Sequence, residues 1–239
     1  HLIRARGDVG GNLAGDANLG GLGHLGGLVL QSGGRPYPPL KPDKSPHHPA
    51  PITPFRGAAS TGRSGGRALD RAMITRSHTK GDAPSTAVYS PCEAYRYALT
   101  RIWDTQGRRV LFVMLNPSTA TEVQNDPTVE RCERRARALG FGGFRVCNIF
   151  AFRATDPRVM RAQADPVGPA NDAAIAEGAL WADSVVCAWG AHGAHLGRGS
   201  AVEALLRATG RPLLHLGLSK AGHPKHPLYI AYECQPQGW

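Results

Sequence analysis

The chain has 239 residues and a formal net charge of +10, with 28 Lys and Arg residues against 18 Asp and Glu. Residues 1–80 carry 11 of the basic and only 4 of the acidic residues, so the later part of the chain is close to charge balance. That balance argues against binding of long duplex DNA. No run approaches the 18 apolar residues of a membrane span, so we expect a cytoplasmic protein.

The N-terminal third differs in composition from the rest of the chain. Residues 1–80 contain 15 of the 30 glycines and almost no extended apolar run. Such a segment buries too little apolar surface to offset its chain entropy. We therefore predict that residues 1–84 are disordered and that residues 85–239 form a single α/β domain. Met73 is the first methionine, and we interpret it as a candidate native start.

The five cysteines are scattered along the chain without a C-x-x-C pair. Their odd number and long spacings predict neither a disulfide framework nor a zinc site. Cys147 and Cys187 fall inside apolar runs, where a thiol is typically a small buried hydrophobic group.

The predicted domain begins with two strands. Residues 95–103 alternate between large apolar and other side chains, which is the period of a strand with one better-buried face. Residues 110–115 (VLFVML) form a continuous apolar run, as expected of a strand covered on both faces. Asp104 to Gly107 would supply the turn. We therefore predict a β-hairpin here.

Helices and strands then alternate along the chain. Asp126 followed by Pro127 marks a helix start, because the carboxylate caps free amides and proline suits the first turn; Gly140 marks the helix end. The further predicted elements are strand 144–150, a helix capped by Asn171-Asp172 and ending at Trp181, strand 184–189, helix 199–209 before Gly210, and strand 212–217.

This order of elements predicts a fold. Strands joined by helices require right-handed parallel crossovers. We predict a three-layer α/β/α sandwich with a mostly parallel central sheet, preceded by the N-terminal β-hairpin strand. Ligands of such sheets bind beyond the carboxyl ends of the strands. Four polar loops follow strands at that edge and predict a site there: LNPSTA, AFRATDP, GAHG and LSKAGHPKHPLY.

The first of these loops supplies an amide, two hydroxyls and a carboxylate. Asn116, Ser118 and Thr119 follow the buried strand directly, and Asp126 closes the loop. Asn and Ser also make ordinary turn bonds, so a structural role is the alternative. The loop is neither a nucleophile elbow nor a P-loop, because the glycine patterns of both are missing.

The next two loops supply a cation and an aromatic ring. Asn148 lies within the predicted strand 144–150, and Arg153 follows that strand. A planar guanidinium there suits a phosphate or carboxylate, although a pair with Asp156 that braces the loop is an equal alternative. Trp189 either stacks on a ligand or belongs to the core. His192 adds a titratable group between two glycines.

The last loop carries Lys220, His223, Lys225 and His226. Pro227 holds the preceding histidine in an extended conformation. An H-x-x-H spacing on a loop is weak evidence for a metal, which needs two or three ligands at fixed spacing. We therefore expect no metal and no cofactor.

Seven motifs in chain order resemble a known family. They span residues 89–230 and are similar to the bacterial and phage family catalogued as domain of unknown function 1643. The resemblance implies no activity. The motifs are YSPCEAYRYALTRIWD, VLFVMLNPSTA, DPTVERC, VCNIFAFRATDP, DPVGPAND, VVCAWGAHG and GLSKAGHPKHPLY.

The order of the strand-end loops also resembles that of the uracil-DNA glycosylase superfamily. Both have an Asn-Pro loop, an Arg-x-x-x-Pro segment, a strand ending in Trp-Gly and a final His-Pro loop. The resemblance implies that Asn116 orients a hydrolytic water and that His226 stabilises charge on the leaving base. Asp126 is a second candidate base on its local chemistry alone. No motif supplies the loop that wedges into duplex DNA, and Asn replaces the acidic water-activating residue or that residue is displaced.

We therefore expect a hydrolase that breaks the base–sugar C–N bond of a nucleobase- or nucleotide-like ligand. A placed water and a donor to the departing base can support an oxocarbenium-like state without a metal. The alternative is a non-enzymatic module that binds a nucleotide or a nucleic-acid end. In that case Arg153, Lys220 and Lys225 bind phosphate and Trp189 stacks on a base.

Overall fold

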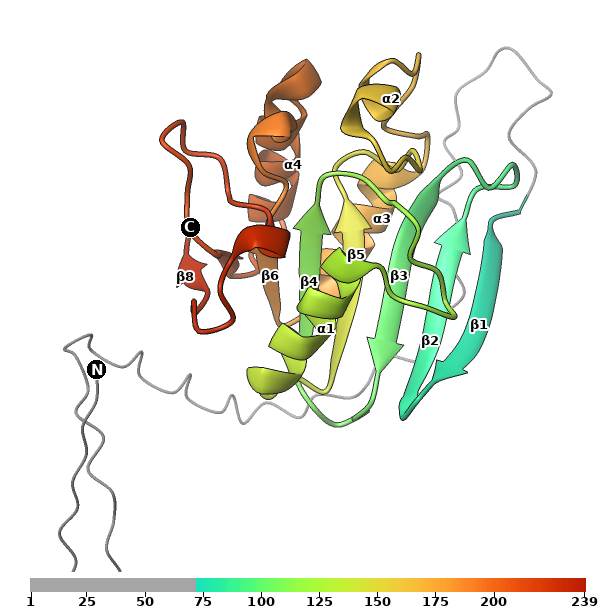
Figure 1. Cartoon of the computed structure of the whole chain (residues 1–239), viewed down its shortest axis with the longest axis vertical. Coiled ribbons are helices and arrows are strands. Elements are labelled where there is room, and N and C mark those ends of the chain that lie inside the picture. Colours follow the sequence, from blue (N-terminus) through green and yellow to red (C-terminus); the bar gives the residue numbers. More distant parts are fainter. Residues whose placement is uncertain (1–71) are drawn as a thin grey trace, which may run out of the picture. The chain divides into compact units, whose positions relative to one another are not determined.

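The structure is a computed structural model that describes residues 72–239 (Figure 1). Residues 1–71, most of the segment predicted to be disordered, lie outside the described residues. One sheet has the strand order β1-β2-β3-β5-β4-β6-β7-β8. Its strands are β1 (Ile74–Lys80), β2 (Ala83–Tyr89), β3 (Arg96–Ile102), β4 (Arg109–Met114), β5 (Gly143–Asn148), β6 (Ser184–Cys187), β7 (Leu213–His215) and β8 (Gln237–Gly238). The helices are α1 (Pro127–Ala138), α2 (Pro157–Arg161), α3 (Asn171–Trp181) and α4 (Arg198–Arg207), with 3-10 segments η1 (Ala191–Gly197) and η2 (Pro227–Tyr229).

The centre of the sheet is parallel and its two sides are antiparallel. β5, β4, β6 and β7 are parallel neighbours. β1, β2 and β3 are joined to one another and to β5 by antiparallel pairs, and β8 pairs antiparallel with β7. The chain is therefore α/β with a mixed sheet. The prediction of a mostly parallel sheet is wrong. Short turns join β1 to β2 and β2 to β3 and allow only antiparallel pairing, and β3 and β8 add antiparallel pairs to β5 and β7.

The predicted hairpin between the first two strands is not formed. β5 lies between β3 and β4, antiparallel to the first and parallel to the second. At the base of this arrangement, Gly142 donates to the Arg108 carbonyl (2.7 Å) and accepts from the Trp103 N–H (2.9 Å). A Cβ on Gly142 would lie 2.4 Å from the Asp104 carbonyl oxygen. The glycine therefore lets the chain enter between the two strands.

The sheet begins earlier than the sequence indicates. β1 and β2 form an antiparallel ladder from Ile74↔Tyr89 to Lys80↔Ala83, closed by a turn at Gly81 with φ 61°. Residues 74–84 thus belong to the sheet, and the domain begins earlier than the predicted start at residue 85. The side chains of β1 are mostly exposed, so no alternation of buried apolar residues marks this edge strand.

Helices cover both faces of the sheet (Figure 1). Successive side chains of β4 point to opposite faces. Val110 and Phe112 pack in an apolar cluster with residues of α1, and Leu111 and Val113 pack in another with residues of α3 and α4. All four are 0 % exposed, which confirms the prediction of a strand covered on both faces.

The helix ends are confirmed for α1 and differ for α3. Asp126 accepts from the Val129 N–H (2.8 Å), Pro127 begins α1, and Gly140 follows the helix with φ 73°. α3 begins at Asn171 without a side-chain cap. The Asn171 amide instead donates to two carbonyls at the end of β5 (2.9 and 3.0 Å), because it is buried beneath that strand end.

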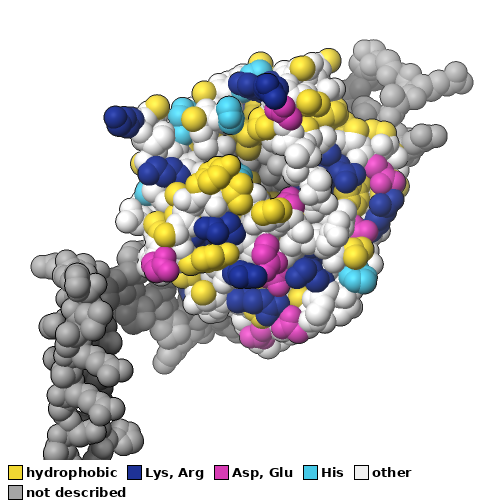
Figure 2. All heavy atoms as spheres, in the orientation of Figure 1, with side chains coloured by type: hydrophobic (Ala, Val, Ile, Leu, Met, Phe, Trp, Pro, Cys, Tyr) yellow, Lys and Arg dark blue, Asp and Glu magenta, His cyan; other side chains and the backbone are white. Residues whose placement is uncertain are grey.

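The C-terminal segment crosses α1 and returns to the sheet. Arg131 donates to the Pro227 carbonyl (3.2 Å), and Arg135 donates to the Cys234 carbonyl (2.6 Å). β8 then pairs with β7. Figure 2 shows basic and acidic side chains intermingled over α1. The face drawn there therefore lacks the continuous basic stripe that long nucleic acids require.

Candidate functional site

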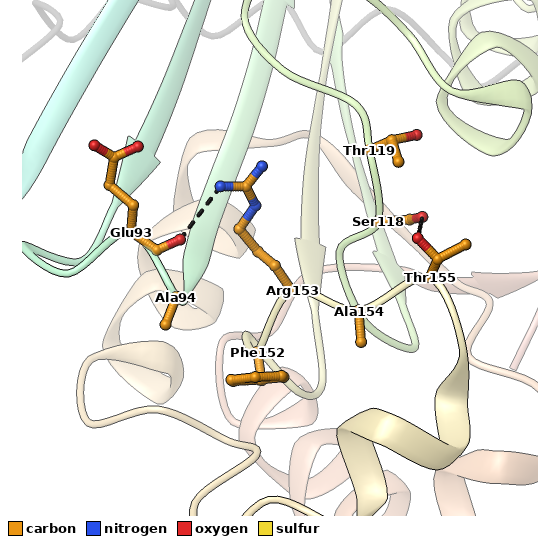
Figure 3. Close-up of a pocket in the computed structure, with 8 residues that line it drawn as sticks. All are labelled: Glu93, Ala94, Ser118, Thr119, Phe152, Arg153, Ala154 and Thr155. Carbon is orange, nitrogen blue, oxygen red and sulfur yellow. Dashed lines mark hydrogen bonds between the residues drawn. The ribbon is translucent and has the colours of Figure 1, made fainter.

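A pocket of about 480 Å³ lies at the edge of the sheet where β4 and β5 end (Figure 3). Because β4 and β5 are parallel, their carboxyl ends share this edge. β3 runs antiparallel to β5, which brings the turn between β2 and β3 to the same place. The lining residues are Glu93, Ala94, Ser118, Thr119, Phe152, Arg153, Ala154 and Thr155.

Hydrogen bonds join the three loops that line the pocket. Ala154 N–H donates to the Pro117 carbonyl (2.9 Å), and Arg153 N–H donates to the Ala94 carbonyl (2.9 Å). The Asn116 amide nitrogen donates to the carbonyls of Ala154 (2.6 Å) and Pro117 (3.0 Å). Asn116 therefore ties the β4 loop to the β5 loop and does not itself line the pocket.

Three hydroxyl groups and one aromatic ring line the pocket. Ser118 and Thr119 come from the β4 loop, and Thr155 comes from the β5 loop. The Ser118 and Thr155 hydroxyl oxygens are 3.4 Å apart, at hydrogen-bond distance. The Phe152 ring lies edge-on to Tyr95, with centroids 5.8 Å apart. The pocket thus offers hydroxyl donors next to an apolar surface.

The Arg153 guanidinium is the cation of the pocket lining. Its Nη1 donates to the Glu93 carbonyl (3.3 Å). The Glu93 carboxylate pairs with Arg76 (2.6 Å) and the Asp156 carboxylate pairs with Arg158 (2.8 Å), so the proposed Arg153–Asp156 brace is absent. Among residues 72–239, no carboxylate lies within ion-pair distance of Arg153. Its charge is available to an anionic ligand.

A bulge places a second arginine behind the pocket. Val88 pairs with Ala98 but Tyr89 pairs with Arg96, so β3 carries one extra residue at this point. Residues 96–101 are all buried, and the predicted alternation of a better- and a worse-buried face is therefore wrong. The cause is that α1 and α3 cover opposite faces of the sheet at β3.

Arg96 is held between two walls of the pocket. Its Nη1 donates to the Ala120 carbonyl, and its backbone N–H donates to the Ala151 carbonyl (3.0 Å). Each of these alanines adjoins a residue that lines the pocket. The Arg96 side chain is only 2 % exposed, and its Nε has no hydrogen-bond partner. Burial lowers the pKa of Arg96 to about 10, although the nearby Asp126 carboxylate opposes this shift.

Asn148 is a further buried polar group at this edge. Val146 belongs to the apolar cluster beneath α1, so Asn148, two residues further along β5, points to the same face. The side chain is 2 % exposed and its Nδ2 has no partner. Asn148 was predicted to bind the ligand, but its side chain is buried, on the sheet face that Arg96 also occupies.

A third arginine anchors the loop after β4. The Arg101 guanidinium donates to the Thr121 carbonyl (2.8 Å), the Glu122 carbonyl (3.3 Å) and the Asn125 side-chain oxygen (2.8 Å). The predicted site residues did not include Tyr89, Glu93, Arg96 or Arg101. The available signal was a pair of arginines inside an otherwise uncharged strand, RYALTRI, since a buried arginine requires partners.

Besides Asn148, three further predicted ligand-binding residues do not line the pocket. Trp189 is 2 % exposed and packs against Trp239, with ring centroids 5.5 Å apart, because the missing side chain of Gly193 admits its ring. It is a core residue and offers no free stacking surface. His192 and Lys220 are exposed on the loops after β6 and β7.

Asp126 and His226 form a separate group at the start of α1. His226 Nδ1 accepts from the Leu228 N–H (3.4 Å). Burial lowers the pKa of His226, and the negative charge of Asp126 partly opposes this effect. Gly190 approaches closely, since a Cβ there would lie 3.7 Å from His226 Cβ. The β6 and β7 loops thus meet beside α1, whereas the pocket is formed by the β4 and β5 loops.

The described part of the chain shows no set of three or more His, Cys, Asp or Glu side chains arranged to hold a metal ion. Within residues 72–239, no helix combines the length and apolar character needed to cross a bilayer.

Among known proteins, a family model described as "Protein of unknown function (DUF1643)" matches residues 96–228. The match contains every pocket residue except Glu93 and Ala94. Neither the curated proteins nor the solved structures gave a match.

Proposed function

Because this chain belongs to the family described as Protein of unknown function (DUF1643), its function must be argued from its own residues, and we propose that the pocket binds an anionic group of a nucleotide-like ligand. The ligand is a free nucleotide or the end of a nucleic-acid strand. The observation that carries this proposal is the Arg153 guanidinium, which lines the pocket and has no carboxylate partner among the residues that the structure describes.

The chemistry of the lining supports this choice of ligand. A guanidinium presents a planar fork of donors that matches phosphate and carboxylate oxygens. The hydroxyls of Ser118, Thr119 and Thr155 supply further donors, and the Phe152 ring offers an apolar surface to a base or sugar. Because Arg76 already pairs with the Glu93 carboxylate, that group repels an incoming anion less than a free carboxylate does.

Titration calorimetry with the four common ribonucleoside 5′-monophosphates tests this proposal. We expect Arg153→Gln to weaken binding roughly tenfold or more, since a charged hydrogen bond contributes about 1.5–3 kcal/mol. Arg108→Gln is the matched control, because Arg108 is exposed and precedes β4 at the opposite edge of the sheet. Full affinity in Arg153→Gln, or no binding of any nucleotide, would overturn the proposal.

A second proposal is hydrolysis of a base–sugar C–N bond, in keeping with the resemblance to the uracil-DNA glycosylase superfamily and its three-layer sandwich. The supporting observation is His226. Since its Nδ1 accepts from Leu228 N–H, the neutral ring carries its proton on Nε2, where it can donate to a leaving base. In this proposal the amide oxygen of Asn116 holds the water, and Asp126 is the candidate second base.

Release of free base is the test of the second proposal. Oligonucleotides containing uracil, hypoxanthine or alkylated bases, and free nucleosides, are incubated with the protein and analysed by chromatography. We expect Asn116→Ala to lower turnover roughly 100-fold with little change in affinity, as for groups that act only in the transition state. Nucleotide binding without base release from any substrate would leave only the first proposal.

A further inference from the structure

The pocket is backed by more positive charge than its surface shows. Arg153 lines it, and the Arg96 guanidinium donates to the carbonyl of Ala120, the residue that follows the lining residue Thr119. Tyr89 connects them: the Arg153 guanidinium carbon is 5.3 Å from the Tyr89 ring centroid, and Tyr89 pairs with Arg96 across the bulge. The two cations are therefore close neighbours at one pocket.

Nearby carboxylates do not balance these two charges. Asp126 acts on Arg96 from the start of α1, but it lies outside ion-pair distance and caps the helix. Glu122 accepts a hydrogen bond from the Tyr89 hydroxyl (2.9 Å) and also influences Arg101. Buried charge without an adjacent counter-charge is costly, and a bound anion would supply that counter-charge.

Unused donors lie in the same region. Three buried nitrogens have no hydrogen-bond partner within the described part of the chain: Arg96 Nε, Arg153 Nε and Asn148 Nδ2. Buried polar groups are almost always satisfied, and each exception calls for a water, an ion or a functional role. Two of these donors belong to the two arginines themselves, and together with the guanidinium charges they favour an anion with several acceptor oxygens near this pocket.

We propose that the group bound at this pocket is a phosphomonoester dianion rather than a carboxylate or a phosphodiester. The inference rests on the proposed nucleotide-binding function and specifies its substrate class. A terminal phosphate has three free oxygens and carries close to two negative charges at neutral pH, with a second pKa of about 6. A phosphodiester has two free oxygens and one charge. Arg153 contacts the group, and Arg96 favours its second charge from behind the wall.

The experiment compares each nucleoside 5′-monophosphate with its 5′-O-methyl phosphodiester, using calorimetry on the full chain. The two compounds share base and sugar and differ by one charge. We expect the monoester to bind at least about tenfold more tightly at pH 7.5, since one charge pair near a protein surface is worth more than 1.4 kcal/mol. Lowering the pH to 5.5 should weaken monoester binding and leave diester binding unchanged.

The outcomes separate this inference from the function on which it rests. Equal affinity for monoester and diester overturns the inference and leaves nucleotide binding intact. Absence of binding by either compound overturns both. A 5′-phosphorylated oligonucleotide compared with its 5′-hydroxyl form shows whether the phosphate belongs to a strand end or a free nucleotide.

Substitution of Arg96 tests the source of the selectivity. Arg96→Met should reduce the ratio of monoester to diester affinity toward unity, and Arg96→Lys should restore part of that ratio. Retained preference in a folded Arg96→Met protein overturns the role of Arg96. If the buried substitution prevents folding, the comparison of ligands on the unaltered chain still decides the inference.

Discussion

Arg96 and Arg101 come from β3, and the guanidinium group of each donates to backbone carbonyls of the loop after β4, which carries one wall of the candidate site. A guanidinium has five donors, so it can join segments that are far apart in sequence. Side chains that do not contact the ligand therefore fix the position of the loop backbone that forms the pocket wall. Asn116 acts similarly, because its amide bonds to Ala154 across two loops.

His226 predicts a pH dependence of stability. Burial lowers its pKa and that of His215 in the folded state, whereas the unfolded value is about 6.5. Below that pH the unfolded chain binds protons that the folded chain does not. Stability should therefore be fully present above about pH 6.5 and be lost as the pH falls toward the folded pKa values.

Urea unfolding between pH 7.5 and 5 measures this effect. We expect the loss of stability on acidification to be smaller in His226→Gln than in the natural chain. His192→Gln, at an exposed position, is the control and should follow the natural profile. An identical slope in His226→Gln and the natural chain would show that His226 does not contribute.

At the scale of elements, the decisive feature is the insertion of β5 between β3 and β4. The insertion places the ends of β4 and β5 side by side with the start of β3, and these three chain segments form the pocket. It depends on a close approach at Gly142, where a Cβ would meet the Asp104 carbonyl. The strand order that forms the candidate site therefore depends on Gly142, which lies at the opposite end of these strands.

Gly142→Ala tests this arrangement. The added methyl group overlaps backbone atoms that cannot move without displacing β5, so we expect a loss of about 2–3 kcal/mol in unfolding free energy. Gly238→Ala is the control, since nothing lies within 4 Å of a Cβ there, and it should change stability by less than about 0.5 kcal/mol. Equal stability of the two variants contradicts the observed strand order.

At the scale of the whole molecule, the edge strand β1 belongs to the same sheet as the candidate site. It pairs along its whole length with β2, and its Arg76 and Lys80 form ion pairs with Glu93 and Glu133. Exposed ion pairs are weak, so the ladder and the packing of Ile74 supply most of the stabilisation. Glu93 lines the pocket, which links the edge strand to the site.

Two truncations measure the contribution of β1. Residues 72–239 retain the strand, and residues 81–239 lack it. We expect the shorter fragment to melt more than about 5 °C lower, which corresponds to roughly 1–2 kcal/mol for a domain of this size. The reason is that β2 would become an unprotected edge with an exposed row of backbone groups. Equal melting temperatures would show that the sheet is stable without β1.

The sequence by itself determined the α/β class, the strands that became β4 to β7, the α1 cap at Asp126, and the loops that supply Ser118, Thr119 and Arg153. These features arise from local signals, namely apolar periodicity, capping and turn residues. Strand order, the bulge that buries Arg96, the core position of Trp189 and the separation of His226 from the pocket were decided by the tertiary structure. Strand pairing and burial depend on contacts between residues far apart in the chain, so one-dimensional patterns do not encode them locally.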